Sequence, residues 1–179
     1  MNEQAISSAS TSMTIQASKA AIWTKVGFYE HVQKEPSWLL KLSLPVPREV
    51  EGHHSKVGDT CRCKYSDGGF LTKRMTRIVD ESRIEFEIIE QSIRYSSTIK
   101  LLGGSIEVEE VDEGQCIVRM VTYYQNLFSL KTISAVFIDK VIKTMHQFVI
   151  ADMRLQLEGC ASPSKNYISA YVNDANITT

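Results

Sequence analysis

SAVFIDKVIKTMHQFVIADMRLQLEG, residues Ser134–Gly159, is the most informative stretch of the chain. Its apolar residues recur every three or four positions over about seven turns, which is the spacing of one face of an α-helix and fits no strand. Such a helix spans roughly 40 Å and is stable mainly through packing of its apolar face, so we expect a broad sheet to cover that face. The final glycine is the expected stop. The apolar stripe consists of Phe137, Ile138, Val141, Ile142, Met145, Phe148, Val149 and Met153.

The region from Arg48 to Tyr124 has the pattern of an antiparallel meander, because alternating apolar and polar residues are separated by turn residues. Basic residues lie among the apolar ones in residues 70–79, so the alternation does not show which face of that segment points inward. We expect Gly103-Gly104 to open a further strand. The other expected strands are residues 60–65, 70–79, 83–89 and 115–124, with turns at 66–69, 80–82 and 112–114.

The segment before the meander predicts one short strand and two short helices. Residues 10–16 alternate weakly and indicate a strand. Ser18 can cap a helix that runs to about His31, and Ser37 can cap a shorter helix that ends before Pro45. With the meander and the long final helix, this order predicts an α+β protein.

Composition excludes several classes of function. The chain has 20 lysines and arginines against 21 aspartates and glutamates, so no net positive field attracts nucleic acid. Its first residues lack the basic and apolar regions of a secretory signal, and no run of about 18 apolar residues could span a membrane. We expect a cytoplasmic protein with no nucleic-acid partner and no integral membrane association, and the sequence indicates no particular protein partner.

The cysteines and histidines give little sign of a metal site. Four cysteines are too few and too scattered for a disulfide framework, so reduced thiols are expected. Cys61 and Cys63 share one face of an expected strand, where a metal pair is conceivable if histidines approach, but buried cysteines are more often small apolar residues. The histidines show no ligand spacing, with His146 at the edge of the helical stripe, and no cofactor-binding glycine motif occurs. We expect no metal and no cofactor.

The order of elements resembles the helix-grip superfamily of START-related and polyketide cyclase/dehydrase-like proteins. The segments that carry the resemblance are ASKAAIW (17–23), PSW (36–38), GG (103–104) with its following strand, and MRLQLE (153–158). The resemblance implies a helix-grip fold, in which a curved antiparallel sheet wraps around the long C-terminal helix. It implies one ligand-binding domain over residues 1–159, followed by a polar tail, 160–179. The chain departs from the usual pattern in that tail and at Cys116, where a threonine often stands.

The resemblance also implies a function. Proteins of this superfamily have a cavity between sheet and helix, so we expect binding of a hydrophobic or aromatic small molecule, lipid-like or polyketide-like. One alternative is a cyclase or dehydratase with an acid or base in the cavity, and another is a protein-binding module that acts through its outer surface. We favour a protein without enzymatic activity. The side chains expected to line the cavity are Tyr65, Phe86, Ile88, Ile106, Val108, Met120, Thr122, Tyr124, Val141, Met145, Phe148 and Asp152.

Asp152 is the candidate catalytic residue, because a carboxylate is unexpected near the centre of an apolar stripe. If the stripe faces a cavity, Asp152 could hold a polar group of a ligand or transfer protons with a raised pKa. Alternatively, the stripe emerges from the sheet at that turn, and Asp152 lies in water or pairs with an arginine. Of the two, we expect the second.

Overall fold

The computed structural model describes residues 5–26, 47–65, 67–94, 96–128 and 131–159. Within them, one seven-stranded antiparallel sheet has the strand order β1-β7-β6-β5-β4-β3-β2. Helix α1 (Lys19–Val26) follows the first strand, and the long helix α3 (Lys131–Glu158) follows the last. The strands are β1 (Ile6–Ile15), β2 (Pro47–Gly52), β3 (Thr60–Tyr65), β4 (Phe70–Val79), β5 (Arg83–Ser92), β6 (Ile99–Asp112) and β7 (Gln115–Asn126).

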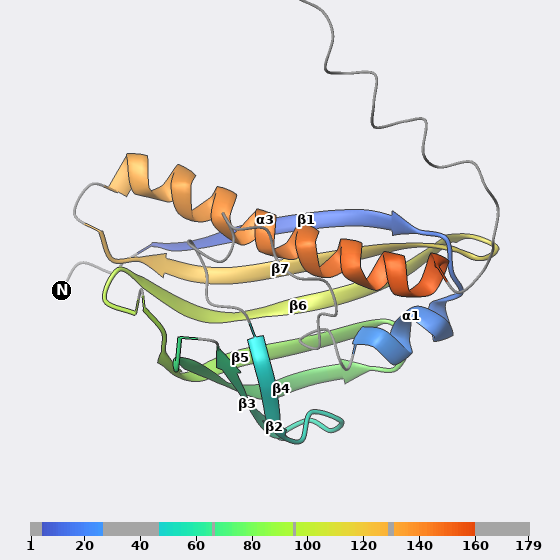
Figure 1. Cartoon of the computed structure of the whole chain (residues 1–179), viewed down its shortest axis with the longest axis horizontal. Coiled ribbons are helices and arrows are strands. Elements are labelled where there is room, and N and C mark those ends of the chain that lie inside the picture. The colour runs from blue at the N-terminus through green and yellow to red at the C-terminus, as the bar shows by residue number, and fades with distance from the viewer. Residues whose placement is uncertain (1–4, 27–46, 66, 95, 129–130, 160–179) are drawn as a thin grey trace, which may run out of the picture.

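Helix α3 lies across one face of the sheet, over β1 and β7 (Figure 1). Helix α1 packs against β6 and against α3. We call the face that these helices cover the inner face; its side chains include Ala9, Cys63, Ile84, Ile106 and Val118, all buried. The opposite side is the outer face. No described helix is both long and apolar enough to cross a membrane.

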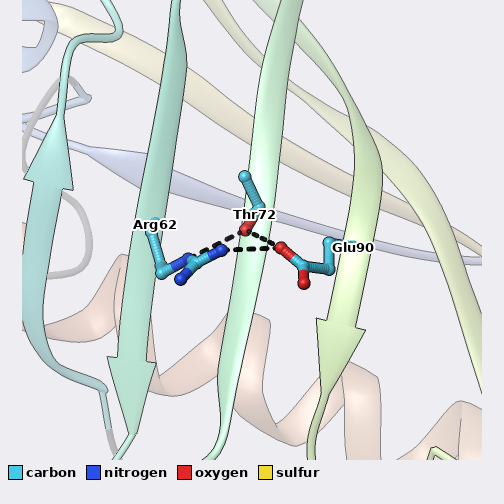
Figure 2. A network of polar contacts seen from close by, with 3 residues as sticks. All are labelled: Arg62, Thr72 and Glu90. Carbon is cyan, nitrogen blue, oxygen red and sulfur yellow. Dashed lines mark hydrogen bonds and ion pairs between the residues drawn. The ribbon is translucent and has the colours of Figure 1, made fainter.

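The outer face is held by charged and polar pairs between neighbouring strands. Figure 2 shows one group, in which Arg62 of β3, Thr72 of β4 and Glu90 of β5 meet on the side of the sheet away from α3. Arg62 Nη2 lies 2.7 Å from Glu90 Oε2, and Arg62 Nε donates to Thr72 Oγ1 at 3.2 Å. Because these side chains are largely exposed, each such pair adds at most about 1 kcal/mol to stability.

Most element predictions are confirmed. The strands β3 and β4 have the predicted bounds, while β1, β5 and β7 have additional residues at one end. Ser18 caps α1, since its Oγ accepts a hydrogen bond from the Ala21 amide at 3.3 Å. Helix α3 begins three residues earlier than predicted and ends before Gly159. The continuation of the first helix to His31, the second short helix and the tail 160–179 lie outside the described residues.

The prediction that Gly103-Gly104 opens a strand is wrong, because both glycines lie inside β6, next to a bulge after Leu101. Gly103 has φ +155°, and a Cβ there would overlap the backbone carbonyl of Phe86 on β5. The register between β5 and β6 ends at this point, at Glu87 and Gly103. Beyond it, the amide of Gln91 binds the backbone of both Ile99 and Leu101 at 2.8 Å. The glycines are therefore required by close strand approach and not by a turn.

The predicted apolar stripe of α3 needs two corrections. Phe137 is 63% exposed and does not belong to the buried stripe, whereas His146, predicted at its edge, is only 4% exposed. The buried row follows helical spacing through Ile138, Ile142 and His146 and continues to Val149 and Met153. The reason is the position of the helix over β1 and β7, which turns this row, and not its neighbour, onto the sheet.

Candidate functional site

A second row of α3 side chains lies about a quarter turn around the helix from the buried row. It consists of Val141, Met145, Phe148 and Asp152, of which the three apolar members are only half-buried. On the other flank of the helix, Glu158 accepts a hydrogen bond from the Gln16 amide, directly after β1, at 3.0 Å. We infer that the second row faces away from β1 and over the remaining strands.

The inner face of the sheet carries every strand residue predicted to line a cavity, but the structure divides them. Ile106, Val108 and Met120 are fully buried in the main core cluster. Tyr124 belongs to a separate cluster with Ala9, Ile138 and Ile142. Four others, which are half-buried, are Tyr65, Phe86, Ile88 and Thr122. The structure therefore brings Tyr65, Phe86 and Met145 to the border of the main core, while Tyr124 packs elsewhere.

Asp152 is buried, at 5% exposure, so the expectation that it lies in water is wrong. Its Oδ2 accepts a hydrogen bond from Gln156 Nε2 at 2.7 Å, one turn further along α3. This end of α3 does not leave the core, because Ile22 and Val26 of α1 belong to the same buried cluster as Met153. A buried carboxylate thus lies on the second row of the helix.

His146 connects α3 to the sheet. Its Nε2 lies 2.8 Å from Thr122 Oγ1 on β7, and its Nδ1 has no hydrogen-bond partner among the described residues. Burial lowers the pKa of His146 to about 4, because the charged imidazolium would lose its hydration. The side chain is therefore neutral near neutral pH and acts as a packed polar group rather than a charged one.

Lys73 is a candidate site residue that the sequence prediction missed. It lies on the inner face of β4 between the buried side chains of Leu71 and Met75, and it is 5% exposed. Its Nζ lies 4.7 Å from the centre of the Phe86 ring. Burial lowers the pKa of Lys73 to about 7. The alternation Leu71, Lys73, Met75 was the signal that could have identified it.

Cys61 and Cys63 share the inner face, as predicted, and Cys61 is the register partner of Lys73 across β3 and β4. Hydrogen bonding to Cys61 and burial raise the pKa of the Cys63 thiol, and burial raises the pKa of Tyr65. Nowhere in the described ranges do three or more histidine, cysteine or acidic side chains form a group that could hold a metal ion. The two thiols therefore form a small polar group beside Lys73.

A cavity of about 450 Å³ lies against the glycine segment of β6. Ser105, which is 3% exposed and whose Oγ lacks a hydrogen-bond partner within the described ranges, lies on its wall. Arg83 and Glu85, which pair at 2.6 Å, and the exposed Tyr123 also line it. These residues belong to the outer face by strand register, so this cavity is not the predicted one between sheet and helix.

Comparison with known proteins shows similarity in structure alone. No protein-family model and no curated protein matches the sequence. Norcoclaurine synthase from Thalictrum flavum, solved with dopamine and hydroxybenzaldehyde, superposes with a TM-score of 0.60 at 16% identity, over 90% of this chain and 91% of that one. The chain has the helix-grip fold.

Two other helix-grip structures are similar over comparable lengths. XoxI from Bacillus cereus has a TM-score of 0.61 at 14% identity, covering 87% of this chain and 99% of that one. The ginseng major latex-like protein 151 from Panax ginseng has a TM-score of 0.57 at 17% identity, covering 85% and 97%. These neighbours belong to the Bet v 1/SRPBCC helix-grip superfamily, so the resemblance predicted from the sequence is confirmed.

Proposed function

We propose that this protein binds a hydrophobic or aromatic small molecule, lipid-like or polyketide-like, between the inner face of its sheet and the second row of α3. The helix-grip fold supports the proposal, because the similar norcoclaurine synthase was solved with dopamine and hydroxybenzaldehyde, both small aromatic molecules. Fold similarity alone does not assign a ligand, so the argument depends on the residues of the site.

The observation that carries the proposal is the incomplete burial of large apolar side chains on the inner side of the molecule. Met145 and Phe148 on α3 and Phe86 and Ile88 on β5 are half-buried, whereas the core residues around Ile106 are fully buried. Ligand sites are typically lined by such apolar and aromatic side chains with a few convergent polar groups. Asp152 and Lys73 supply polar groups that could orient a ligand.

The proposal is tested by filling the space with a larger side chain. We expect Met145→Trp to weaken the binding of Nile red, a neutral apolar dye, by about tenfold or more, which corresponds to roughly 1.4 kcal/mol. The matched control is Leu155→Trp, which adds the same side chain at an exposed position of the same helix. Dye affinity is measured by fluorescence titration, and circular dichroism checks that both variants are folded.

A second measurement uses the protein as purified. Native mass spectrometry followed by organic extraction should find an apolar molecule retained by the wild-type protein and depleted in Met145→Trp. The proposal fails if the folded protein neither retains nor binds any apolar molecule. It also fails if Met145→Trp and Leu155→Trp bind the dye equally.

Proton transfer by Asp152 is a second candidate function, of the cyclase or dehydratase type. It is favoured by the burial of this carboxylate on the second row of α3, held by Gln156 at 2.7 Å. A positioned buried carboxylate can serve as a general acid or base, typically contributing about 10²- to 10⁴-fold to a rate. For a substrate found by screening aromatic polyketides, Asp152→Asn should reduce turnover by that range. An unchanged turnover removes Asp152 from this role.

A further inference from the structure

Lys73 is an unusual residue for the inner face of a sheet. Lysine is almost never fully buried without compensating interactions, because moving an ammonium group out of water is costly. Here the neighbours along β4 are Leu71 and Met75, and the register partners on the adjacent strands are Cys61 and Ile88. The Nζ atom lies over the Phe86 ring at 4.7 Å. The amine is thus held in an apolar and aromatic setting, on the side of the sheet that faces α3.

We propose that Lys73 is a nucleophilic amine that captures an apolar aldehyde or ketone as a Schiff base. This inference rests on the proposed function, since the carbonyl compound must enter the space between the inner face and α3. The proposal narrows the ligand from apolar small molecules in general to those that carry a carbonyl group. Phe86, half-buried beneath the amine, offers a surface on which an aromatic aldehyde can stack.

The chemistry balances without any additional oxidant or reductant. The lone pair of the neutral amine attacks the carbonyl carbon, a C–N bond forms, and the carbonyl π electrons move to oxygen. That oxygen takes a proton from nitrogen, which gives a carbinolamine. Loss of the hydroxyl group and the second nitrogen-bound proton as water then gives the imine. An amine held in apolar surroundings is activated for this reaction because its neutral form is favoured.

The protonation state of Lys73 supports the same role. With its pKa lowered to about 7, about half of the amine is neutral at neutral pH, whereas an exposed lysine is neutral in roughly one molecule per thousand or fewer. The titratable groups that share its side of the molecule are the thiols of Cys61 and Cys63 on β3 and the carboxylate of Asp152 on α3. Their own titration therefore has to be separated from that of Lys73 by substitution.

The test is reductive trapping with benzaldehyde and sodium cyanoborohydride at about pH 7. We expect intact-mass and peptide mass spectrometry to find one benzyl group, on Lys73, added at least about ten times faster than on any other lysine. Lys73→Arg and Lys73→Met should both lose this adduct; the second is included because arginine could disturb the core. The control Lys100→Arg, at an exposed position of β6, should keep it. The trapping rate on Lys73 should reach half its maximum near pH 7 rather than near pH 10.

Two results would overturn the inference. One is an adduct distributed over surface lysines and unchanged in Lys73→Met. The other is tight, saturable binding of benzyl alcohol or benzoate, which lack an aldehyde, with no covalent trapping of benzaldehyde on Lys73. The second result would leave the proposed binding function intact, so failure of the carbonyl chemistry is distinguishable from failure of ligand binding. Protection of Lys73 from benzaldehyde by excess benzyl alcohol is the expected result if both proposals hold.

Discussion

The Nε2 atom of His146 on α3 lies 2.8 Å from the Oγ1 atom of Thr122 on β7, and His146 is buried between the helix and the sheet. We expect Thr122→Val to lower the free energy of unfolding by about 1–3 kcal/mol, because it leaves a buried ring nitrogen without its partner. The control Thr14→Val, at an exposed position of β1, should change it by less than about 0.5 kcal/mol. Urea unfolding measures both. Equal effects of the two substitutions would show that the contact contributes nothing.

The same histidine predicts how stability depends on acid. Its pKa is lowered from 6.5 to about 4 by burial, so between these values the unfolded chain binds a proton that the folded chain does not. Stability contributed by neutral His146 is therefore complete above about pH 6.5 and is lost as the pH falls to about 4, by up to roughly 3 kcal/mol. His146→Gln should reduce this acid-dependent loss. Urea unfolding at several pH values compares the slopes, and identical slopes would contradict the prediction.

Lys73 predicts the opposite end of the pH range. Its pKa is lowered from 10.5 to about 7, so between these values the unfolded chain holds a proton that the folded chain lacks. Stability should therefore rise with pH above about 7, by at most roughly 1.4 kcal/mol per pH unit. This rise should be absent in Lys73→Met and retained in Lys100→Met, an exposed control. A wild-type curve parallel to that of Lys73→Met would contradict the buried amine.

Gly103 should tolerate no side chain. Its φ is +155°, and a Cβ would overlap the Phe86 carbonyl, so Gly103→Ala must displace β5 or β6. We expect a loss of about 2–4 kcal/mol in the free energy of unfolding. Gly114→Asn is the control, because its φ of +71° suits asparagine and no atom lies near the added Cβ. It should cost less than about 1 kcal/mol. If Gly103→Ala is as stable as Gly114→Asn, the glycine is not required by close packing.

Much of the fold follows from short-range patterns. The period of the apolar residues in Ser134–Gly159 is sufficient for a helix, and strict alternation with turn residues is sufficient for β3, β4 and the start of β5. These features depend on backbone geometry within a few residues, so they can be predicted without knowledge of the partner elements. The order of these elements was also sufficient for the helix-grip resemblance, which the structure confirms.

The candidate site depends on contacts that local patterns do not contain. Alternation places Leu71, Lys73 and Met75 on one side of β4, but only pairing with β3 and β5 shows that this side is the inner face. Likewise, helical spacing allows either Phe137 or His146 into the stripe. The crossing of α3 over β1 and β7 buries His146 and exposes Phe137. Burial and pKa are properties of the surroundings of a side chain, so the amine of Lys73 became a candidate only in the folded chain.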